Sequence, residues 1–599
     1  MHESLAPTRI DRGYRRLALG AVLVQVCVII LLLRNSYFIA EDLYLPGLLA
    51  QLPWSAETLT RSMFGHLMPG FVAVWKAVAS AGTLSWPLVG VIIVAIHVAL
   101  LVGTVRLFTA LHGRRWWVPL AALAASLSLA LLSCVVWWGA ALAPGIGAVA
   151  AVWVWDSTVR YLRARSAPRL LAVLLTMVVA MSFGERQILT PVYILGFILL
   201  VGIAPLSTFR ARWRVALGGW PAWTAMAVVA IAFLVVYFLG GYREDSGSTA
   251  PASAIATYMG RSLVEGYLPS VLGVLPGSSP PILGWVAVGI VGAFVVFTSL
   301  KSVRSAHAWL WLLIAYVLCQ LPIAVGRVGI IGVDAAVDMV RYYPEATLLF
   351  WIAASVAVSA APRMRDVTRQ RTVIAIAAVI AVLMTAVWAW SAATISNTSA
   401  GVASKRFFSQ LADPSSKLGA ALESGEVRML TVPLPDKVIS EGMYPWNLSD
   451  RIYPWVRRGT EMTSLVEGSL MLNKDGSGST PMFTTIHDVA FFSGPGCTSS
   501  DEQPVSVLQG RLTPKLVGGM VRMTVSAKDP AEIRVLSRRP DGSTWPVDNQ
   551  SGPAYRIPSG VSTLVVPVAP IAADLVTLRV EFGGTVCVTA ADLVRPVYR

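Results

Sequence analysis

The sequence predicts a polytopic α-helical membrane protein, N-terminus in and C-terminus out, that ends in an extracytoplasmic β-sandwich domain. Of its 599 residues, 55% are hydrophobic and only 14% are charged, and the mean hydropathy is +0.64. Soluble globular chains average about 25% charged residues. Apolar runs long enough to cross a bilayer fill the sequence before residue 390, and the runs after it shorten to the length of β-strands.

A transmembrane helix needs about 20 apolar residues to cross some 30 Å of hydrocarbon, and by this measure the sequence predicts about eleven spans. The predicted spans are residues 17–33, 86–108, 117–133, 141–160, 169–184, 188–204, 221–240, 282–300, 308–325, 345–361 and 372–390. Together they make residues 1–390 the predicted transmembrane domain.

The charges between these runs predict the orientation, because Lys and Arg collect in loops that stay cytoplasmic. Every second connection is basic, beginning with the arginines of residues 9–16 and ending with those of residues 363–371, whereas the opposite connections hold most of the carboxylates. We therefore expect a cytoplasmic N-terminus, a multi-pass protein of the cell (inner or plasma) membrane, and an extracytoplasmic location for everything after about residue 391.

The net charge of +15 has the same explanation. Lys and Arg in cytoplasmic loops make a membrane protein basic without any nucleic-acid partner. The sequence has no soluble patch in which aromatic and basic residues alternate, which is the pattern expected of nucleic-acid binding. The predicted partners are instead the lipid bilayer and molecules held at its outer face.

The first external loop, about residues 34–85, begins with two adjacent carboxylates, Glu41 and Asp42, in the stretch YFIAEDLYLPG. They precede an apolar segment too short to cross the membrane, which we expect to lie as a helix in the interface. The loop at about 241–281 predicts a second interfacial helix. A carboxylate pair in low dielectric costs free energy unless something uses it, and a solvated flank of the first span is the plainer alternative.

Residues 391–599 predict a separate domain with its own core. Short β-branched runs such as VRMTVSA and STLVVPVAP alternate with turn residues, which is typical of a β-sandwich. Cys497 and Cys587 lie in this domain, where an extracytoplasmic disulfide can persist. The other three cysteines, Cys27, Cys134 and Cys319, lie in apolar runs and are expected as small buried side chains.

Further polar and aromatic residues gather at the predicted outer ends of the spans. Glu185 and Arg186 interrupt apolar sequence in SFGERQILTP. A charge in hydrocarbon costs about 2.5–3.5 kcal/mol, so this hairpin should face water or a cavity. The other candidates are His66, Trp137, Trp138, Arg327, Arg341, Tyr342 and Tyr343. The plainer alternatives are solvated flanks for the charges and interfacial belt positions for the aromatic residues.

Together these side chains suit one kind of chemistry. A carboxylate can act as general base toward a hydroxyl, and arginine binds phosphate or diphosphate oxygens with a planar fork of N–H groups. Both are needed to use a lipid-phosphate-linked sugar at a membrane face.

The layout resembles the GT-C superfamily of membrane glycosyltransferases. The resemblance rests on many spans, an acidic pair just after the first span, interfacial helices in the first loop and a soluble C-terminal β-domain. Within that superfamily it is similar to the actinobacterial cell-envelope arabinofuranosyltransferases and mannosyltransferases that use polyprenyl-phosphate sugars. It implies that an acidic residue of the first loop is the base or orients the acceptor. The matching positions are Glu41 and Asp42, where the family often has two Asp residues.

The resemblance implies a transfer from a polyprenyl-phosphate sugar donor to a cell-envelope glycan acceptor, with inversion. Asp42 is slightly favoured over Glu41 as the base. Arg186, Arg327 and Arg341, with His66 and Tyr342, are the candidates for the donor phosphate. Trp137, Trp138, Glu185 and Tyr343 are the candidates for sugar or acceptor contacts. The β-domain would then bind carbohydrate, and a divalent metal cation stays open as a cofactor because no dedicated ligand set is visible.

Two other classes of function stay open. A transporter or flippase of a lipid-linked glycan also needs a polar cavity with arginines, but transporters usually show repeated halves with broken helices near the midplane, and the sequence shows no repeat. A non-catalytic glycan-binding envelope protein is the second alternative, although it would need far fewer spans.

Overall fold

The computed structural model describes most of the chain, in two compact units. The described residues are 9–63, 65–82, 84–203, 208–240, 250–360, 367–435, 437–439, 447–488, 496–498, 505–510, 520–538, 544–545, 555–567, 576–582 and 586–598. Unit 1 comprises Met1–Ser36, Pro53–Val74 and Trp86–Ser399, and unit 2 comprises Tyr37–Leu52, Trp75–Ser85 and Ala400–Arg599. Each unit is described by itself.

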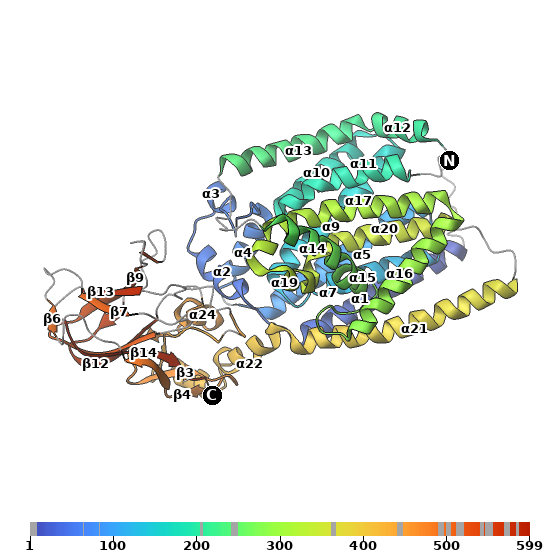
Figure 1. The fold of residues 1–599 in the computed structure, drawn as a ribbon. Coiled ribbons are helices and arrows are strands. Elements are labelled where there is room, and N and C mark those ends of the chain that lie inside the picture. The colour runs from blue at the N-terminus through green and yellow to red at the C-terminus, as the bar shows by residue number, and fades with distance from the viewer. Residues whose placement is uncertain are drawn as a thin grey trace. The chain divides into compact units, whose positions relative to one another are not determined.

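Every helix or strand named among the described residues of unit 1 is a helix (Figure 1). Its longer helices are α1 (Arg9–Leu33), α5 (Trp86–His112), α6 (Trp117–Ser126), α9 (Ile146–Arg163), α10 (Ala167–Phe183), α11 (Thr190–Leu200), α12 (Phe209–Gly218), α13 (Trp220–Leu239), α14 (Ala252–Arg261), α16 (Pro281–Lys301), α17 (Val303–Gly326), α20 (Pro344–Ala360) and α21 (Val367–Thr398). Its short helices are α3 (Ala56–Leu59), α7 (Leu129–Leu132), α8 (Trp138–Ala140), η1 (Ala141–Gly145), η2 (Glu185–Leu189), η3 (Ser262–Tyr267), α15 (Leu268–Val271), α18 (Val328–Ile331), α19 (Val333–Asp338) and η4 (Val340–Tyr342). Helix α4 (Pro69–Ser80) has residues in both units.

These are the helices of a multi-pass membrane protein. Among the residues that the structure describes, six helical segments are long and apolar enough to cross a membrane: Arg12–Leu33, Trp86–His112, Trp138–Arg163, Trp220–Leu239, Pro281–Lys301 and Val303–Gly326. Three further apolar helices are shorter: Trp117–Ser126, Ala167–Phe183 and Pro344–Ala360. Every run predicted as a span contains a helix, but the predicted number of spans and their orientation stay predictions.

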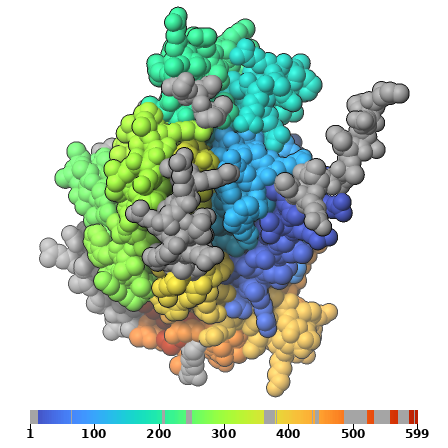
Figure 2. Space-filling model, turned by 90° about the vertical axis from the view of Figure 1, so that its right-hand side faces the viewer, coloured from blue at the N-terminus to red at the C-terminus, as the bar shows by residue number. Residues whose placement is uncertain are grey.

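Helices α10 to α13, drawn in teal, stand at one edge of unit 1 in both views of the molecule (Figures 1 and 2). Helices α9 and α10 run antiparallel, because α9 ends at Arg163 and α10 begins at Ala167. The first turn of α10, which contains Arg169, therefore lies beside the basic last turn of α9. The opposite end of α10 leads to Glu185. The core of this unit includes large aromatic side chains such as Trp155, Phe197 and Trp311, whose rings meet edge to face with centroids 5.2–5.8 Å apart.

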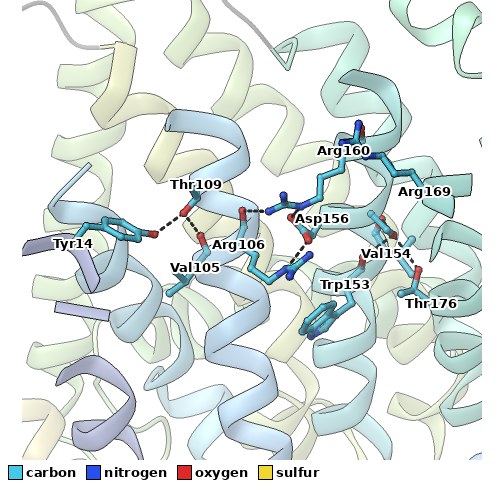
Figure 3. Close-up of polar contacts among 11 residues, drawn as sticks. Tyr14, Val105, Arg106, Thr109, Trp153, Val154, Asp156, Arg160, Arg169 and Thr176 are labelled. Atoms are coloured by element: carbon cyan, nitrogen blue, oxygen red, sulfur yellow. Dashed lines mark hydrogen bonds and ion pairs between the residues drawn. The ribbon is translucent and has the colours of Figure 1, made fainter. Parts of the chain in front are cut away.

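The basic end of α5 and α9 is held by a buried carboxylate (Figure 3). Asp156 is 1% exposed, and its Oδ2 lies 3.0 Å from Arg106 Nε while its Oδ1 lies 2.7 Å from Arg160 Nε. Arg106 also lies over the ring of Trp153, 5.0 Å from its centroid. Because two arginines share one carboxylate, both of its oxygens are occupied.

Unit 2 combines helices with three sheets. Its helices are α2 (Glu41–Ala50), α22 (Ala400–Ala412), α23 (Lys417–Glu423) and α24 (Ser449–Val456). Its strands are β1 (Arg428–Leu430), β2 (Met462–Thr463), β3 (Ser469–Leu472), β4 (Gly478–Ser479), β5 (Phe483–Asp488), β6 (Gly496–Thr498), β7 (Val505–Gly510), β8 (Met520–Ala527), β9 (Ala531–Arg538), β10 (Thr544–Trp545), β11 (Tyr555–Ile557), β12 (Gly560–Pro567), β13 (Val576–Phe582) and β14 (Val586–Pro596). The predicted strand-rich C-terminal region is confirmed.

Two of the sheets are antiparallel and have five strands each, in the orders β10-β9-β13-β7, with β11 on β9, and β12-β8-β14-β5, with β6 on β14. Strand β8 alternates buried and half-buried residues over most of its length, as expected when one face of a sheet is covered. The third sheet, β2-β1-β3-β4, pairs β1 in parallel with β2 and β3. A parallel pair needs a crossover, and α24 lies between β1 and β2 in the chain.

Candidate functional site

A chain of hydrogen bonds in unit 1 joins three residues that the sequence nominated separately. His66 Nδ1 lies 2.5 Å from Glu185 Oε1, and Arg327 Nη2 lies 2.7 Å from His66 Nε2. His66 precedes α4, Glu185 opens η2 after α10, and Arg327 follows α17. These side chains therefore meet at the ends of separate helices. At a helix end, a polar side chain does not interrupt the apolar face of the helix.

The geometry assigns the roles of the two ring nitrogens of His66. Arg327 can only donate, so Nε2 must accept, and Nδ1 then carries the proton that it donates to Glu185. Both nitrogens of His66 are thus engaged within the protein. The second oxygen of Glu185, Oε2, is buried and has no hydrogen-bond partner among the residues that the structure describes.

A second carboxylate, Glu345 at the start of α20, closes a neighbouring network. Its Oε1 accepts a hydrogen bond from Gln187 Nε2, and its Oε2 lies 3.5 Å from Arg186 Nη2 and 3.6 Å from Cys319 Sγ. Arg186 Nη2 also reaches the Cys319 carbonyl at 3.5 Å. Arg186 and Glu185 are adjacent in the chain, yet the structure gives them different partners.

The third group is built on Trp137. The guanidinium of Arg341 lies over the Trp137 ring, 4.0 Å from its centroid, and 5.7 Å from the centroid of Tyr342. Its Nη2 donates a hydrogen bond to Met339 Sδ at 3.4 Å. Within the described part of the chain no carboxylate pairs with Arg341. Stacking on an indole holds a guanidinium by cation–π attraction and leaves the N–H groups at its edge to other acceptors.

Two of the nominated aromatic residues are packed in the core. Trp138 and Tyr343 are both 0% exposed. The Tyr343 hydroxyl donates to the Val337 carbonyl at 2.8 Å, and its ring lies 6.1 Å from that of Tyr267. Their predicted contacts with sugar stay predictions.

The acidic pair lies in unit 2, in the first turn of α2. Asp42 is 0% exposed, whereas Glu41 is half-buried. Burial, together with the charges of Glu41 and Asp42, raises the pKa of Tyr44 well above its usual value. The tyrosine hydroxyl therefore lies within the field of both carboxylates.

The backbone entering α2 is strained. Ala40 has φ 49° and ψ −124°, the one non-glycine residue with positive φ in the described chain. Such a conformation costs about 1–3 kcal/mol and persists only when its surroundings enforce it. Here the Ala40 N–H reaches the Val438 carbonyl at 3.5 Å. Strained residues cluster at functional sites, so the strain at Ala40 indicates that the start of α2 has a functional role.

Sequence reasoning missed several supports of these groups. It did not single out Glu345, whose partner Gln187 lies 158 residues away in the chain. In unit 2, Lys76 is 3% exposed and donates from Nζ to the Leu49 carbonyl at 2.9 Å, at the end of α2. A Cβ on Gly47 would lie 2.5 Å from Trp455 Nε1, so α2 and α24 pack too closely for a larger residue. The sequence did offer one signal for this contact, because Lys76 lies within an otherwise apolar stretch.

Unit 2 also contains a pocket of about 530 Å³, lined among others by Arg428, Thr431, Asp450, Thr463 and Arg556. Burial raises the pKa of Asp450, and its Oδ1 has no hydrogen-bond partner among the described residues. The pocket therefore offers hydroxyl groups, a carboxylate and guanidinium groups to a polar ligand.

The predicted disulfide and the possible metal cofactor are not tested by the described side chains. In the register of β6 and β14, Cys497 stands opposite Cys587, but the Cys497 side chain lies outside the described residues, so the disulfide stays a prediction. No group of three or more His, Cys, Asp or Glu residues that could hold a metal is found among the described residues.

No protein-family model and no curated protein matches the chain. Among solved structures, the cryo-EM structure of arabinosyltransferase EmbB from Mycobacterium smegmatis aligns with 100% of this chain and 66% of its own, at 12% identity and a TM-score of 0.34. The chain thus spans just under two thirds of the length of EmbB. So low a TM-score does not establish a shared fold.

Proposed function

We propose that this protein is a membrane glycosyltransferase of the GT-C type. It moves a sugar from a polyprenyl-phosphate donor to a cell-envelope glycan or glycolipid at the outer face of the membrane. The observation that carries the proposal is the Arg341 guanidinium, which lies over the Trp137 ring, 4.0 Å from its centroid, and pairs with no carboxylate in the described chain. A half-buried cation without a counter-charge beside apolar helices suits an anionic, lipid-linked group.

The charge of the reaction fits such a cation. A polyprenyl-phosphate sugar is a phosphodiester with one negative charge, and the departing polyprenyl phosphate carries up to two. A positive group placed at the developing charge stabilises the transition state more than the ground state. Arg341 supplies that group. Arg186 and Arg327 hold the networks of Glu345 and His66, and the apolar helices of unit 1 provide a lipid-compatible surface for the polyprenyl chain.

The transfer is a single displacement. The acceptor hydroxyl gives its proton to a carboxylate of the first loop, for which Asp42 is favoured over Glu41. Its oxygen forms a bond to the anomeric carbon while the bond from that carbon to the phosphate oxygen breaks. One displacement inverts the anomeric centre. The burial of Asp42 and the strain at Ala40 support a functional role for this turn of α2.

Unit 2 would hold the glycan. Its pocket exposes threonine hydroxyls, arginines and the Asp450 carboxylate, groups that suit a polyhydroxylated ligand. The proposed orientation places this unit outside the cell, as the alternation of basic loops predicts.

A matched pair of arginines tests the proposal. Arg341 and Arg106 both lie over a tryptophan ring, 4.0 and 5.0 Å from its centroid, but of the two only Arg106 has a carboxylate partner within the described chain. In nanodiscs, with a labelled polyprenyl-phosphate sugar and a glycan acceptor, Arg341→Gln should lower the transfer rate about 100- to 1,000-fold. Arg106→Gln should stay within about twofold of wild type. Equal rates for the two variants would contradict the proposal, and movement of lipid-linked glycan without transfer would favour the transporter.

A further inference from the structure

The second oxygen of Glu185 is an unexplained buried acceptor. Oε1 takes a proton from His66 at 2.5 Å, but Oε2 is buried without a hydrogen-bond partner among the described residues. Buried polar atoms in native proteins nearly always have a partner, and an ionised carboxylate loses more than a neutral group when it has none. Oε2 itself is closed to solvent, whereas the side chain as a whole is 31% exposed, so a ligand at the exposed part of Glu185 would meet Oε2 through a turn of that side chain.

The surroundings restrict what that ligand can be. Arg186, the next residue, contacts Glu345 and Cys319, and Arg327 contacts His66. Among the described residues, neither arginine donates a hydrogen bond to Oε2. A phosphate would bring negative charge and acceptor oxygens to a carboxylate, and would be repelled. A neutral hydroxyl brings a donor, and a hydrogen bond to an ionised carboxylate is among the stronger ones.

From this geometry we infer that Glu185 Oε2 binds a hydroxyl of a sugar substrate, and that His66 and Arg327 are positioning residues for Glu185. This inference rests on the proposed function, which supplies the sugar. His66 fixes the carboxylate through Nδ1–H, and Arg327 fixes the tautomer of His66 by donating to Nε2. In this arrangement His66 has no ring nitrogen left for the donor phosphate.

Glu345 provides the matched control, because it is a neighbouring carboxylate with both oxygens engaged. In Glu185→Gln the amide oxygen can accept from His66, which leaves an –NH₂ donor where Oε2 accepted. We expect this variant to raise KM about 10- to 100-fold for one sugar substrate, the size of a lost hydrogen bond to a charged group. An increase in the KM of the polyprenyl-phosphate sugar identifies a hydroxyl of the donor, and an increase in the KM of the glycan identifies one of the acceptor. Glu345→Gln should leave both KM values within about threefold.

The positioning role has its own readout. In His66→Asn the side-chain amide can still donate to Glu185 Oε1, whereas in His66→Ala nothing can. His66→Ala should therefore raise the same KM that Glu185→Gln raises, and His66→Asn should recover most of it. If the two His66 variants are alike, or if they change the other KM, the positioning role is wrong.

The outcomes separate this inference from the proposed function. Transfer by the wild type, with both KM values unchanged in a folded Glu185→Gln variant, would overturn the inference and leave the function standing. Absence of transfer by the wild type would overturn the function. In that case titration calorimetry with methyl arabinofuranoside and methyl mannopyranoside decides the inference. Weaker binding of either sugar to Glu185→Gln supports it, and equal binding, or no binding to the wild type, overturns it.

Discussion

The two ends of the helical segment Trp138–Arg163 use the same residue types for opposite purposes. Near one end, Arg106 lies over Trp153 and shares the buried Asp156 with Arg160. Just before the other end, Arg341 lies over Trp137 with no carboxylate partner in the described chain. At the first end both oxygens of the Asp156 carboxylate are occupied. By contrast, in the network of His66 and Arg327, Glu185 Oε2 has no hydrogen-bond partner among the described residues.

The difference separates stability from binding. A carboxylate saturated by two arginines lowers the free energy of the folded state and has nothing left to offer a ligand. An uncompensated guanidinium and an unpartnered carboxylate oxygen cost free energy in the isolated protein. They gain partners when an anion or a hydroxyl binds. The first end should therefore respond to mutation in stability, and the second in activity.

The largest stability effect should come from Asp156→Ala. It leaves Arg106 and Arg160 facing each other without their shared carboxylate. Because both arginines are well exposed, 46% and 39%, we reduce the usual cost of breaking a buried pair to about 2 kcal/mol. Denaturant or thermal unfolding in detergent measures it, with Glu185→Ala as the control. A larger loss of unfolding free energy for Glu185→Ala than for Asp156→Ala would contradict the division between a stabilising end and a binding end.

A smaller loss is expected when one arginine is removed and the carboxylate stays. In Arg160→Gln or Arg106→Gln, Asp156 keeps one charged partner, so each variant should lose about 1 kcal/mol or less. Arg106→Gln also loses its contact with Trp153. The same unfolding experiment checks both variants. A loss as large as that of Asp156→Ala would mean that the two arginines do not share the charge.

The smallest effect concerns Tyr14. Its hydroxyl lies 2.6 Å from Thr109 Oγ1, and Thr109 donates to the Val105 carbonyl at 2.6 Å, so Tyr14 is the donor (Figure 3). Tyr14→Phe removes one partly exposed neutral hydrogen bond, and should cost about 0.5 kcal/mol. No change in transfer activity is expected, since this contact belongs to the first end of the segment. A loss of activity without a loss of stability would contradict that division.

The sequence predicted the helices well because their signal is local. An apolar run of sufficient length is visible without knowing its neighbours, and α5, α9 and α16 follow their predicted runs closely. The run 117–133 was predicted as one span, but α6 ends at Ser126 and α7 begins at Leu129. The strands of unit 2 were likewise predicted from local alternation. The parallel pairing of β1 was not predicted, because its partners β2 and β3 follow α24 in the chain and are distant from β1 in sequence.

The networks could not be predicted, because they join distant residues. His66 and Glu185 are 119 residues apart, and His66 and Arg327 are 261 apart. Nothing in the sequence shows that Glu185 turns toward a histidine while Arg186 turns toward Glu345. The sequence placed most of these charges at the same face, and the structure supplied the pairing that distinguishes an occupied charge from an available one.

The central claim is that a carboxylate of the first loop accepts the proton of the attacking hydroxyl. It is tested most directly by the transfer rates of Asp42→Asn and Glu41→Gln from a polyprenyl-phosphate sugar, in protein shown to be folded. Loss of a general base typically lowers the rate about 100- to 10,000-fold. We predict a loss of that size for Asp42→Asn and a smaller one for Glu41→Gln. Full activity in both variants would contradict the account.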